Sequence, residues 1–91
     1  QYLNVIMELG IQKNNKLESK IQKEVIDKME AQGFFVIKLI KTNKNGIPDL
    51  LCMRKDEYFF IEVKSAKGKL SEIQKYRIKE LERFGVKSFV I

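Results

Sequence analysis

Three short apolar segments in the middle of the chain place the strongest limit on its fold. They are Phe34–Ile40, Asp49–Met53 and Tyr58–Lys64. Each has the length and the aromatic or branched composition of a β-strand. Only the charged turn Arg54–Glu57 separates the second segment from the third, so we expect these two to pair as an antiparallel hairpin.

An amphipathic helix is predicted before these strands, over residues 16–32. Apolar side chains recur there at every fourth position and define one face. They are Leu17, Ile21, Val25 and Met29. Gly33 follows, where helices commonly end in glycine. The apolar segment 2–9 fits a short helix, an edge element or part of a dimer contact.

A second helix is predicted after the strands. Ser71 is a favourable N-cap residue, and Gln74 three positions later completes a capping box. The helix runs to about Phe84, and its core face is expected to contain Ile73, Leu81 and Phe84. The last segment, Val86–Ile91, is predicted to be a strand.

The predicted order of elements is therefore α-β-β-β-α-β. This is an α/β fold in which helices flank a mixed central sheet. Its last three elements form a β-α-β unit, normally a right-handed parallel crossover. A chain of 91 residues is of one-domain size. We assign residues 17–91 to that domain and residues 1–16 to an N-terminal extension.

The absence of histidine and the single cysteine exclude several kinds of chemistry. Without histidine there is no Ser-His-Asp or Cys-His catalysis and no imidazole-ligated zinc. Cys52 alone forms neither an internal disulfide nor a cysteine-rich metal site, and its apolar segment predicts that it is buried. Any metal is therefore held by oxygen atoms, which favours Mg²⁺, Mn²⁺ or Ca²⁺.

The charge balance is basic, with 18 Lys and Arg against 12 Asp and Glu, a net charge of +6. This favours a polyanionic partner, although many small domains are basic for solubility alone. No apolar run approaches the roughly 20 residues that span a bilayer, and the first ten residues lack the basic start of a signal peptide. We therefore expect an intracellular, cytoplasmic protein with no membrane partner.

The most informative segment is residues 46–64, which contains G-I-P-D, twelve further residues and then E-V-K. Side chains alternate along a strand, so Glu62 and Lys64 point to one face. If the hairpin pairs as predicted, Asp49 approaches Glu62. Two carboxylates at a strand end can bind a hard divalent cation, and the lysine can polarise a water or stabilise negative charge on a phosphate. A metal-assisted phosphodiester hydrolase without histidine needs such a site.

A structural interpretation of these charges stays open, because E-x-K on a strand also occurs as a solvent-exposed charged pair. Two details weigh against it. The strand that carries Glu62 is otherwise strongly apolar, so a charge there needs a reason. Asp49 directly follows Pro48, at a junction between loop and strand.

Three pieces of the sequence together resemble a known family: GIPDLL, then FIEVK, then GKLSEIQ. The combination is similar to the virus-type replication-repair nuclease module, VRR-NUC, a branch of the PD-(D/E)XK nucleases. An upstream helix that holds ESKI and ends at a glycine also fits. The resemblance covers about Leu17 to Ile91. It implies a restriction-endonuclease-like fold and a divalent-metal-dependent DNA nuclease.

The resemblance implies a role for each residue of the central motif. Asp49 and Glu62 would bind the metal, Mg²⁺ or Mn²⁺, with the backbone carbonyl of Val63 as a further ligand. Lys64 would be the catalytic lysine of E-x-K. These assignments come from the family and extend what the spacing alone indicates.

The resemblance adds two residues from helices to the site, Gln74 and Glu18, and each of them also has another interpretation. Gln74 would match the glutamine near the family's active site, yet a capping-box glutamine is already satisfied by the helix N-terminus; the two roles can coexist. Glu18, within ESKI, would be the first-helix acid, with a water-mediated metal contact as one option. Glu24 and Glu30 lie on the same helix, where solvated acids are expected, and Glu24 is the second choice.

Five lysines near the predicted site are candidates for phosphate contacts. They are Lys38, Lys41, Lys44, Lys67 and Lys69. Each alone is better explained as a solvated lysine, but as a group they are plausible DNA ligands, because Lys67 and Lys69 directly follow the strand of Glu62. Ser65 lies close to the same strand end.

The resemblance implies structure-specific cleavage of branched DNA, such as four-way Holliday junctions, by a homodimer with two symmetry-related sites. No organic cofactor is expected, and a stand-alone module suggests a phage origin in a bacterial host. Two other functions stay open. One is a non-catalytic nucleic-acid-binding module, against which the complete set of Asp49, Glu62 and Lys64 argues. The other is a structural domain in which E-x-K is a surface pair.

Overall fold

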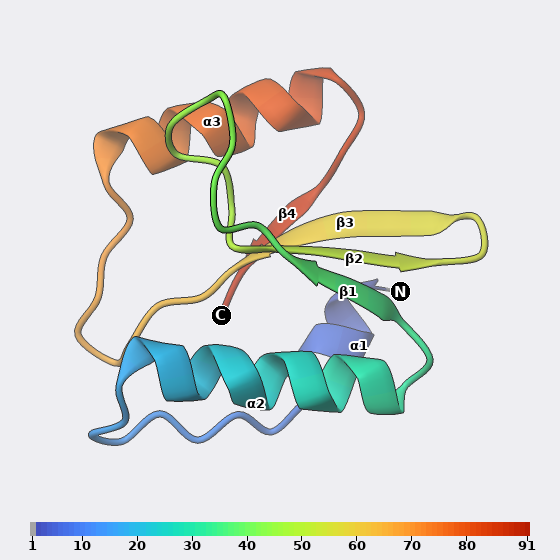
Figure 1. Ribbon diagram of the computed structural model, residues 1–91, viewed down its shortest axis with the longest axis vertical. Coiled ribbons are helices and arrows are strands. Elements are labelled where there is room, and N and C mark those ends of the chain that lie inside the picture. Colours follow the sequence, from blue (N-terminus) through green and yellow to red (C-terminus); the bar gives the residue numbers. More distant parts are fainter. Residues whose placement is uncertain (1) are drawn as a thin grey trace.

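The computed structural model describes residues 2–91, which form helices on both sides of one sheet (Figure 1). The elements are α1 (Tyr2–Met7), α2 (Glu18–Ala31), β1 (Phe35–Lys38), β2 (Leu50–Arg54), β3 (Glu57–Glu62), α3 (Glu72–Arg83) and β4 (Ser88–Val90). Apart from the added α1, this is the predicted order. The apolar segment 2–9 therefore forms a short helix, one of the three alternatives.

The sheet is mixed and its strands lie in the order β1-β2-β3-β4. The first three strands pair antiparallel, and the β2–β3 pair is the predicted hairpin, with Leu50 opposite Ile61. The chain then crosses through α3 and returns as β4, parallel to β3. Figure 1 shows α2 on one side of the sheet and α3 on the other. The α/β fold with a mixed central sheet is confirmed.

The core lies between α2 and one face of the sheet. Ile21, Val25 and Met29 of α2 are fully buried, as the four-residue spacing predicts. They face alternate strand residues, which are Leu50, Cys52, Phe59 and Ile61. Leu17 is different, since it is 68% exposed. It occupies the N-cap position, one residue before the first helical turn begins.

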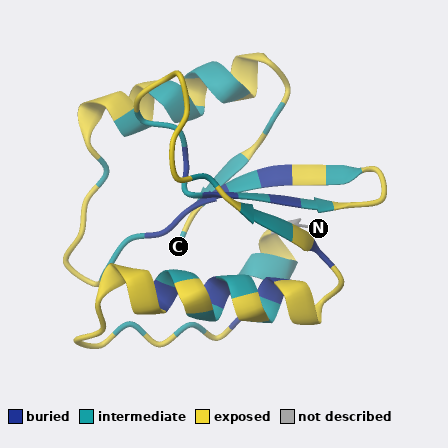
Figure 2. Cartoon of the chain, viewed as in Figure 1, coloured by how far each residue is buried: buried dark blue, intermediate teal, exposed yellow. Residues whose placement is uncertain are grey.

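The other face of the sheet is thinly covered. Helix α3 has no fully buried residue. Of its three expected core residues, Ile73 and Phe84 are 42% and 80% exposed, so the prediction is wrong for these two, whereas Leu81 is half-buried. The physical reason is visible in Figure 1, where α3 lies over one end of the sheet and the β2–β3 hairpin extends beyond it. Within residues 2–91, no further helix or strand covers α3 from outside. Figure 2 shows α3 without any buried segment.

Apolar side chains continue along this thinly covered face, which we call the open sheet face. Its members alternate with the core residues and line up across the strands by register. They are Phe35, Ile37, Leu51, Met53, Tyr58 and Phe60. Phe35 is 65% exposed and Tyr58 is 54% exposed. The site described below lies at one end of the same face.

The N-terminal segment packs on the domain. Leu9 is buried in the core, and Val5 and Ile6 of α1 pack against it. The Lys28 ammonium of α2 donates to the Leu9 carbonyl at 2.8 Å. Among residues 2–91, no helix has the length and apolar composition needed to cross a membrane.

Candidate active site

The hairpin register brings Asp49 and Glu62 to facing positions. Leu50 pairs with Ile61, so the next residue outward on each strand is Asp49 on one side and Glu62 on the other. The Val63 backbone N–H donates to Asp49 Oδ2 at 2.8 Å. Asp49 is thereby fixed across the strand end, and its side chain is close enough to interact with that of Glu62. The structure brings together the two carboxylates of the predicted site.

Glu62 ends β3 and is buried, with 1% of its surface exposed. Two backbone bonds to the last residue hold it there: Ile91 N–H donates to the Glu62 carbonyl at 2.9 Å, and Lys64 N–H donates to the Ile91 carbonyl at 2.8 Å. Regular β3 pairing stops at Glu62, so Lys64 lies just outside the strand to which the sequence assigned it. Its side chain nevertheless turns to the same face as Glu62.

Lys64 and Gln74 meet the Glu62 carboxylate from two directions. Lys64 Nζ lies 3.5 Å from Glu62 Oε2 as an ion pair, and Gln74 Nε2 donates to the same oxygen at 3.3 Å. Gln74 also completes the predicted capping box of α3 with Ser71. Its side-chain oxygen accepts from the Ser71 N–H, which leaves its amide NH₂ for Glu62. The structural and the site contacts therefore coexist in one side chain.

Burial and the adjacent Asp49 carboxylate raise the pKa of Glu62 to about 7, an effect that Lys64 opposes. A buried carboxylate beside a second carboxylate is costly in its charged form. A cation bound between the two relieves this cost, because it supplies the positive charge that one lysine provides only in part. A metal ion bound here would replace the proton that Glu62 holds at low pH.

The donor set fits a hard divalent cation. Asp49 and Glu62 offer carboxylate oxygens, and the Val63 carbonyl belongs to the residue between Glu62 and Lys64. No cluster of three or more His, Cys, Asp or Glu side chains that could hold a metal occurs in the described range, residues 2–91. A metal here would take further ligands from water or substrate. Mg²⁺ commonly binds in this way, through one or two carboxylates.

The acidic residues of α2 that were candidates for the site, Glu18 and Glu24, have no hydrogen bond or ion pair with its other described residues. Glu18 is exposed in the first turn of α2, on the side that continues towards Ile21 and Val25, and it makes no three-carboxylate cluster with Asp49 and Glu62. Glu24 pairs instead with Lys16 and Lys28, each at 3.1 Å. These two ion pairs explain the presence of Glu24 without a role in the site. The role of Glu18 stays a prediction.

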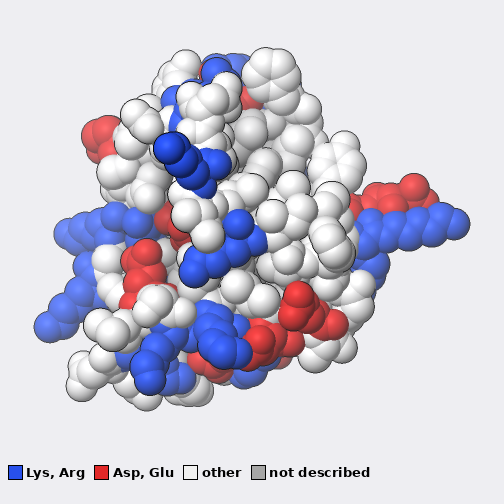
Figure 3. All heavy atoms as spheres, viewed as in Figure 1, with Lys and Arg blue, Asp and Glu red and all other residues white. Residues whose placement is uncertain are grey.

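All five candidate DNA-binding lysines are exposed. Lys67 and Lys69 follow the site on the loop between β3 and α3. Figure 3 shows lysine and arginine side chains gathered on the left of the view, where this loop runs in Figure 1. Lys38 ends β1 on the other side of the site. Their positions are compatible with a phosphate backbone that passes the two carboxylates.

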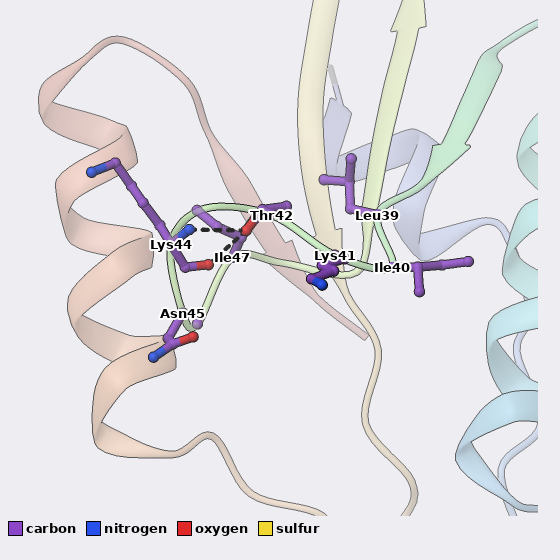
Figure 4. A pocket seen from close by; sticks show the side chains of 8 residues that line it. Leu39, Ile40, Lys41, Thr42, Lys44, Asn45 and Ile47 are labelled. Carbon is purple, nitrogen blue, oxygen red and sulfur yellow. Dashed lines mark hydrogen bonds between the residues drawn. The ribbon is translucent and has the colours of Figure 1, made fainter.

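Lys41 and Lys44 belong to the loop that leads from β1 to Asp49. Residues 39–42 and 44–47 of this loop line a hollow of about 260 Å³, and Figure 4 shows Lys44 and Asn45 on the side of α3. Thr42 Oγ1 donates to the Lys44 carbonyl at 2.6 Å, which makes a tight turn. The hollow is not the metal site, since neither carboxylate lines it; it lies beside the site.

Gly46 lets this loop approach α3. Its φ is +80°, and a Cβ placed on it would lie 2.7 Å from the backbone oxygen of Ile73. The first residue of G-I-P-D is therefore glycine for a steric reason that the sequence alone does not show. Buried Pro48 then directs the chain into Asp49, and Leu39 N–H closes the loop at its base by donating to the Asp49 carbonyl at 2.8 Å.

We expect Gly46→Ala to destabilise the fold by about 1–3 kcal/mol, because the added methyl meets backbone and the positive φ disfavours a side chain. Chemical denaturation measures the change. Gly10→Ala is the matched control: its φ is also positive, at +64°, but no atom lies within 4 Å of the added Cβ. An equal loss in both variants would show that the close approach to α3 carries no cost.

Comparison with known families agrees with this geometry. The family model described as VRR-NUC domain matches residues 10–91. The chain belongs to the VRR-NUC family. No curated protein and no solved structure matches it. The family match begins before Leu17, where the motif resemblance starts, and it includes the segment that follows the buried Leu9.

Membership makes this a nuclease-type domain of the PD-(D/E)XK superfamily. VRR-NUC nucleases generally use divalent metals, and a nuclease domain has DNA as its substrate. In the VRR-NUC domain described here, the E-x-K motif is Glu62–Lys64 and the preceding aspartate is Asp49. These are the residues that the fold brings to one strand end.

The raised pKa of Glu62 predicts that metal binding depends on pH. Below pH 7 a metal must displace the Glu62 proton, so we expect Mn²⁺ affinity to rise about tenfold from pH 6 to pH 8 and then to level off. Isothermal titration calorimetry in buffers of different ionisation enthalpy measures both the affinity and the proton released. An affinity that is constant over this range, without proton release, would contradict the assignment of Glu62 as a ligand.

Proposed function

We propose that this protein is a Mg²⁺- or Mn²⁺-dependent endodeoxyribonuclease whose site is formed by Asp49, Glu62 and Lys64. One observation supports it above the others. The only fully buried charged side chain among residues 2–91, Glu62, faces a second carboxylate and lies 3.5 Å from a lysine ammonium. A buried arrangement of this kind is costly for a merely structural domain, and it suits phosphodiester hydrolysis.

Each residue has a part that its contacts support. Asp49 and Glu62 would hold the metal together with the Val63 carbonyl, and Gln74 keeps the Glu62 carboxylate in place. A divalent cation held by these residues would neutralise phosphate charge and would lower the pKa of a water bound to it. Lys64 contributes a positive charge beside the phosphate that is being attacked, where charge develops in the transition state.

The preferred substrate in this proposal is branched DNA, with the exposed lysines on the loops beside the site as backbone contacts. Phosphate contacts of this kind position a duplex without reading its sequence. Selection among DNA structures then depends on shape. A nuclease that acts on DNA in this way is expected to work inside the cell.

A cleavage panel tests the proposal. Purified protein is incubated with four-way junctions, flaps, single strands and plain duplex, with Mg²⁺, with Mn²⁺ or with EDTA. We expect cleavage of branched DNA with metal and none with EDTA. If all substrates bind but stay uncut at every metal and salt concentration, the protein is a non-catalytic binding module and the proposal is wrong.

We also propose that the protein acts as a homodimer that associates through the open sheet face. Phe35 and Tyr58 leave more than half of their surface exposed there, and a two-fold contact would match this apolar face with its copy. The six apolar residues of this face carry no charge, whereas the charged residues Asp49, Glu62 and Lys64 lie at its end.

Sedimentation velocity tests the dimer and its surface. Phe35→Lys is expected to convert the dimer to a monomer, whereas Met7→Lys, at a 72% exposed position on α1, is expected to leave it intact. The reverse result would place the contact on the N-terminal extension instead. A wild-type protein that is monomeric at all concentrations would contradict the dimer.

A further inference from the structure

One turn of α3 contacts both halves of the site. Gln74 donates to Glu62, as described, and Arg77, three residues later, donates through Nε to the Asn45 carbonyl at 2.8 Å. Residues three apart lie on the same side of a helix. Asn45 belongs to the loop that ends at Asp49. Helix α3 therefore connects the strand that carries one carboxylate with the loop that carries the other.

The loop has two points of attachment. Its base is closed by the bond between Leu39 N–H and the Asp49 carbonyl, and its tip rests on α3, where Gly46 packs against the backbone of Ile73. Between these points lies the exposed turn at Thr42. At the tip, two side chains of α3 lie against the loop, Ile73 beside Gly46 and Arg77 at Asn45, and Arg77 is the one that donates a hydrogen bond to the loop.

Arg77 is held in one orientation. Its side chain is only 13% exposed, and its Nη1 donates to Glu80 Oε1 at 2.6 Å, one turn further along α3. Two of its donors thus act at once, one on the loop carbonyl and one on the carboxylate. The planar fork of a guanidinium can do this, while a single ammonium group has no comparable fixed geometry.

We propose that Arg77 is a positioning residue that holds the loop so that Asp49 stays beside Glu62. Its hydrogen bonds go to the Asn45 carbonyl and to Glu80, not to the proposed metal ligands, so it acts on the site through Asn45. Its effect on metal binding and cleavage rests on the function proposed above. The positioning itself does not, because the Val63 N–H that donates to Asp49 and the Arg77 bond to Asn45 involve only residues of this chain.

The Val63 amide is the reporter for this test. Its N–H donates to the Asp49 side chain, whereas its neighbour Lys64 donates to the backbone of Ile91. If the loop moves, Val63 loses its acceptor and its amide exchanges faster with solvent, while the Lys64 amide is unaffected. Hydrogen exchange by NMR on the metal-free protein measures both amides side by side.

We expect Arg77→Gln to increase Val63 amide exchange about tenfold and to weaken Mn²⁺ binding by a similar factor, with Lys64 amide exchange unchanged. Arg77→Lys should show the same change, since it keeps the charge but not the fork. Arg83→Gln is the matched control, because it removes an exposed charge from the last turn of α3. It should change neither quantity.

The outcomes separate the two proposals. Wild-type Val63 exchange in a folded Arg77→Gln protein would overturn the positioning role. Faster Val63 exchange in that variant, together with a wild-type protein that binds no Mn²⁺ and cuts no DNA, would support the positioning role and contradict the nuclease proposal. Should Arg77→Gln fail to fold, Glu80→Gln carries the same test, because it removes the carboxylate that orients Arg77.

Discussion

Glu62→Gln is expected to abolish DNA cleavage and to make the metal-free protein more stable at pH 8. The amide oxygen lacks the negative charge of a carboxylate and is a much weaker ligand for Mg²⁺ or Mn²⁺, so cleavage should fall by at least about a hundredfold. The same change removes a buried charge that burial and Asp49 destabilise. We expect a gain of about 1–2 kcal/mol, or several degrees in melting temperature.

The pH dependence of this gain follows from the direction of the pKa shift. The folded-state pKa of Glu62 is raised from 4.5 to about 7, so the wild-type protein loses stability as the pH rises through that interval. The glutamine variant has no such loss. The difference in melting temperature should therefore be small near pH 5 and largest at pH 8. A variant that is less stable than the wild type at pH 8 would show that the buried Glu62 carboxylate does not destabilise the fold.

Lys64→Met is expected to separate metal binding from cleavage. The methionine keeps much of the side-chain length but removes the charge, so Mn²⁺ should bind at least as tightly as in the wild type, because a repelling ammonium is lost. Cleavage should fall by about a hundredfold to a thousandfold, since a positive charge next to the phosphate is missing from the transition state. Calorimetry and single-turnover cleavage measure the two effects.

Lys67→Met is the matched control for this variant, because it removes an equal charge three residues away on an exposed loop. It should weaken DNA binding modestly and reduce its salt dependence, with the cleavage rate of bound DNA unchanged. If Lys64→Met behaved in the same way as Lys67→Met, Lys64 would be a backbone contact and not a catalytic residue.

The sequence predicted the parts of the fold that are determined locally. The spacing of Ile21, Val25 and Met29 located α2 and its buried face, and the short charged turn after β2 predicted the hairpin. The capping box at Ser71 located the start of α3. Because strand pairing is a consequence of the hairpin, the approach of Asp49 to Glu62 was also accessible from the sequence.

Long-range packing was less accessible. The exposed Phe84 shows that an apolar residue at helical spacing need not face a core, since α3 covers only one end of the sheet. Gly46 and Arg77 were not assigned a role, because both act through backbone oxygens of segments far away in the chain. The glycine of G-I-P-D was the available signal for a close approach; nothing in the sequence indicated its partner.

Single-turnover cleavage of a four-way junction with Mn²⁺ by wild type and Lys64→Met, at protein concentrations that saturate the DNA, tests the central claim most directly. The account predicts that the wild type cuts the junction and that Lys64→Met binds it equally well but cuts it at least about a hundredfold more slowly. Equal cleavage by both proteins, or no cleavage by a wild-type protein with Mn²⁺ bound, would contradict the assignment of Asp49, Glu62 and Lys64 as a nuclease site.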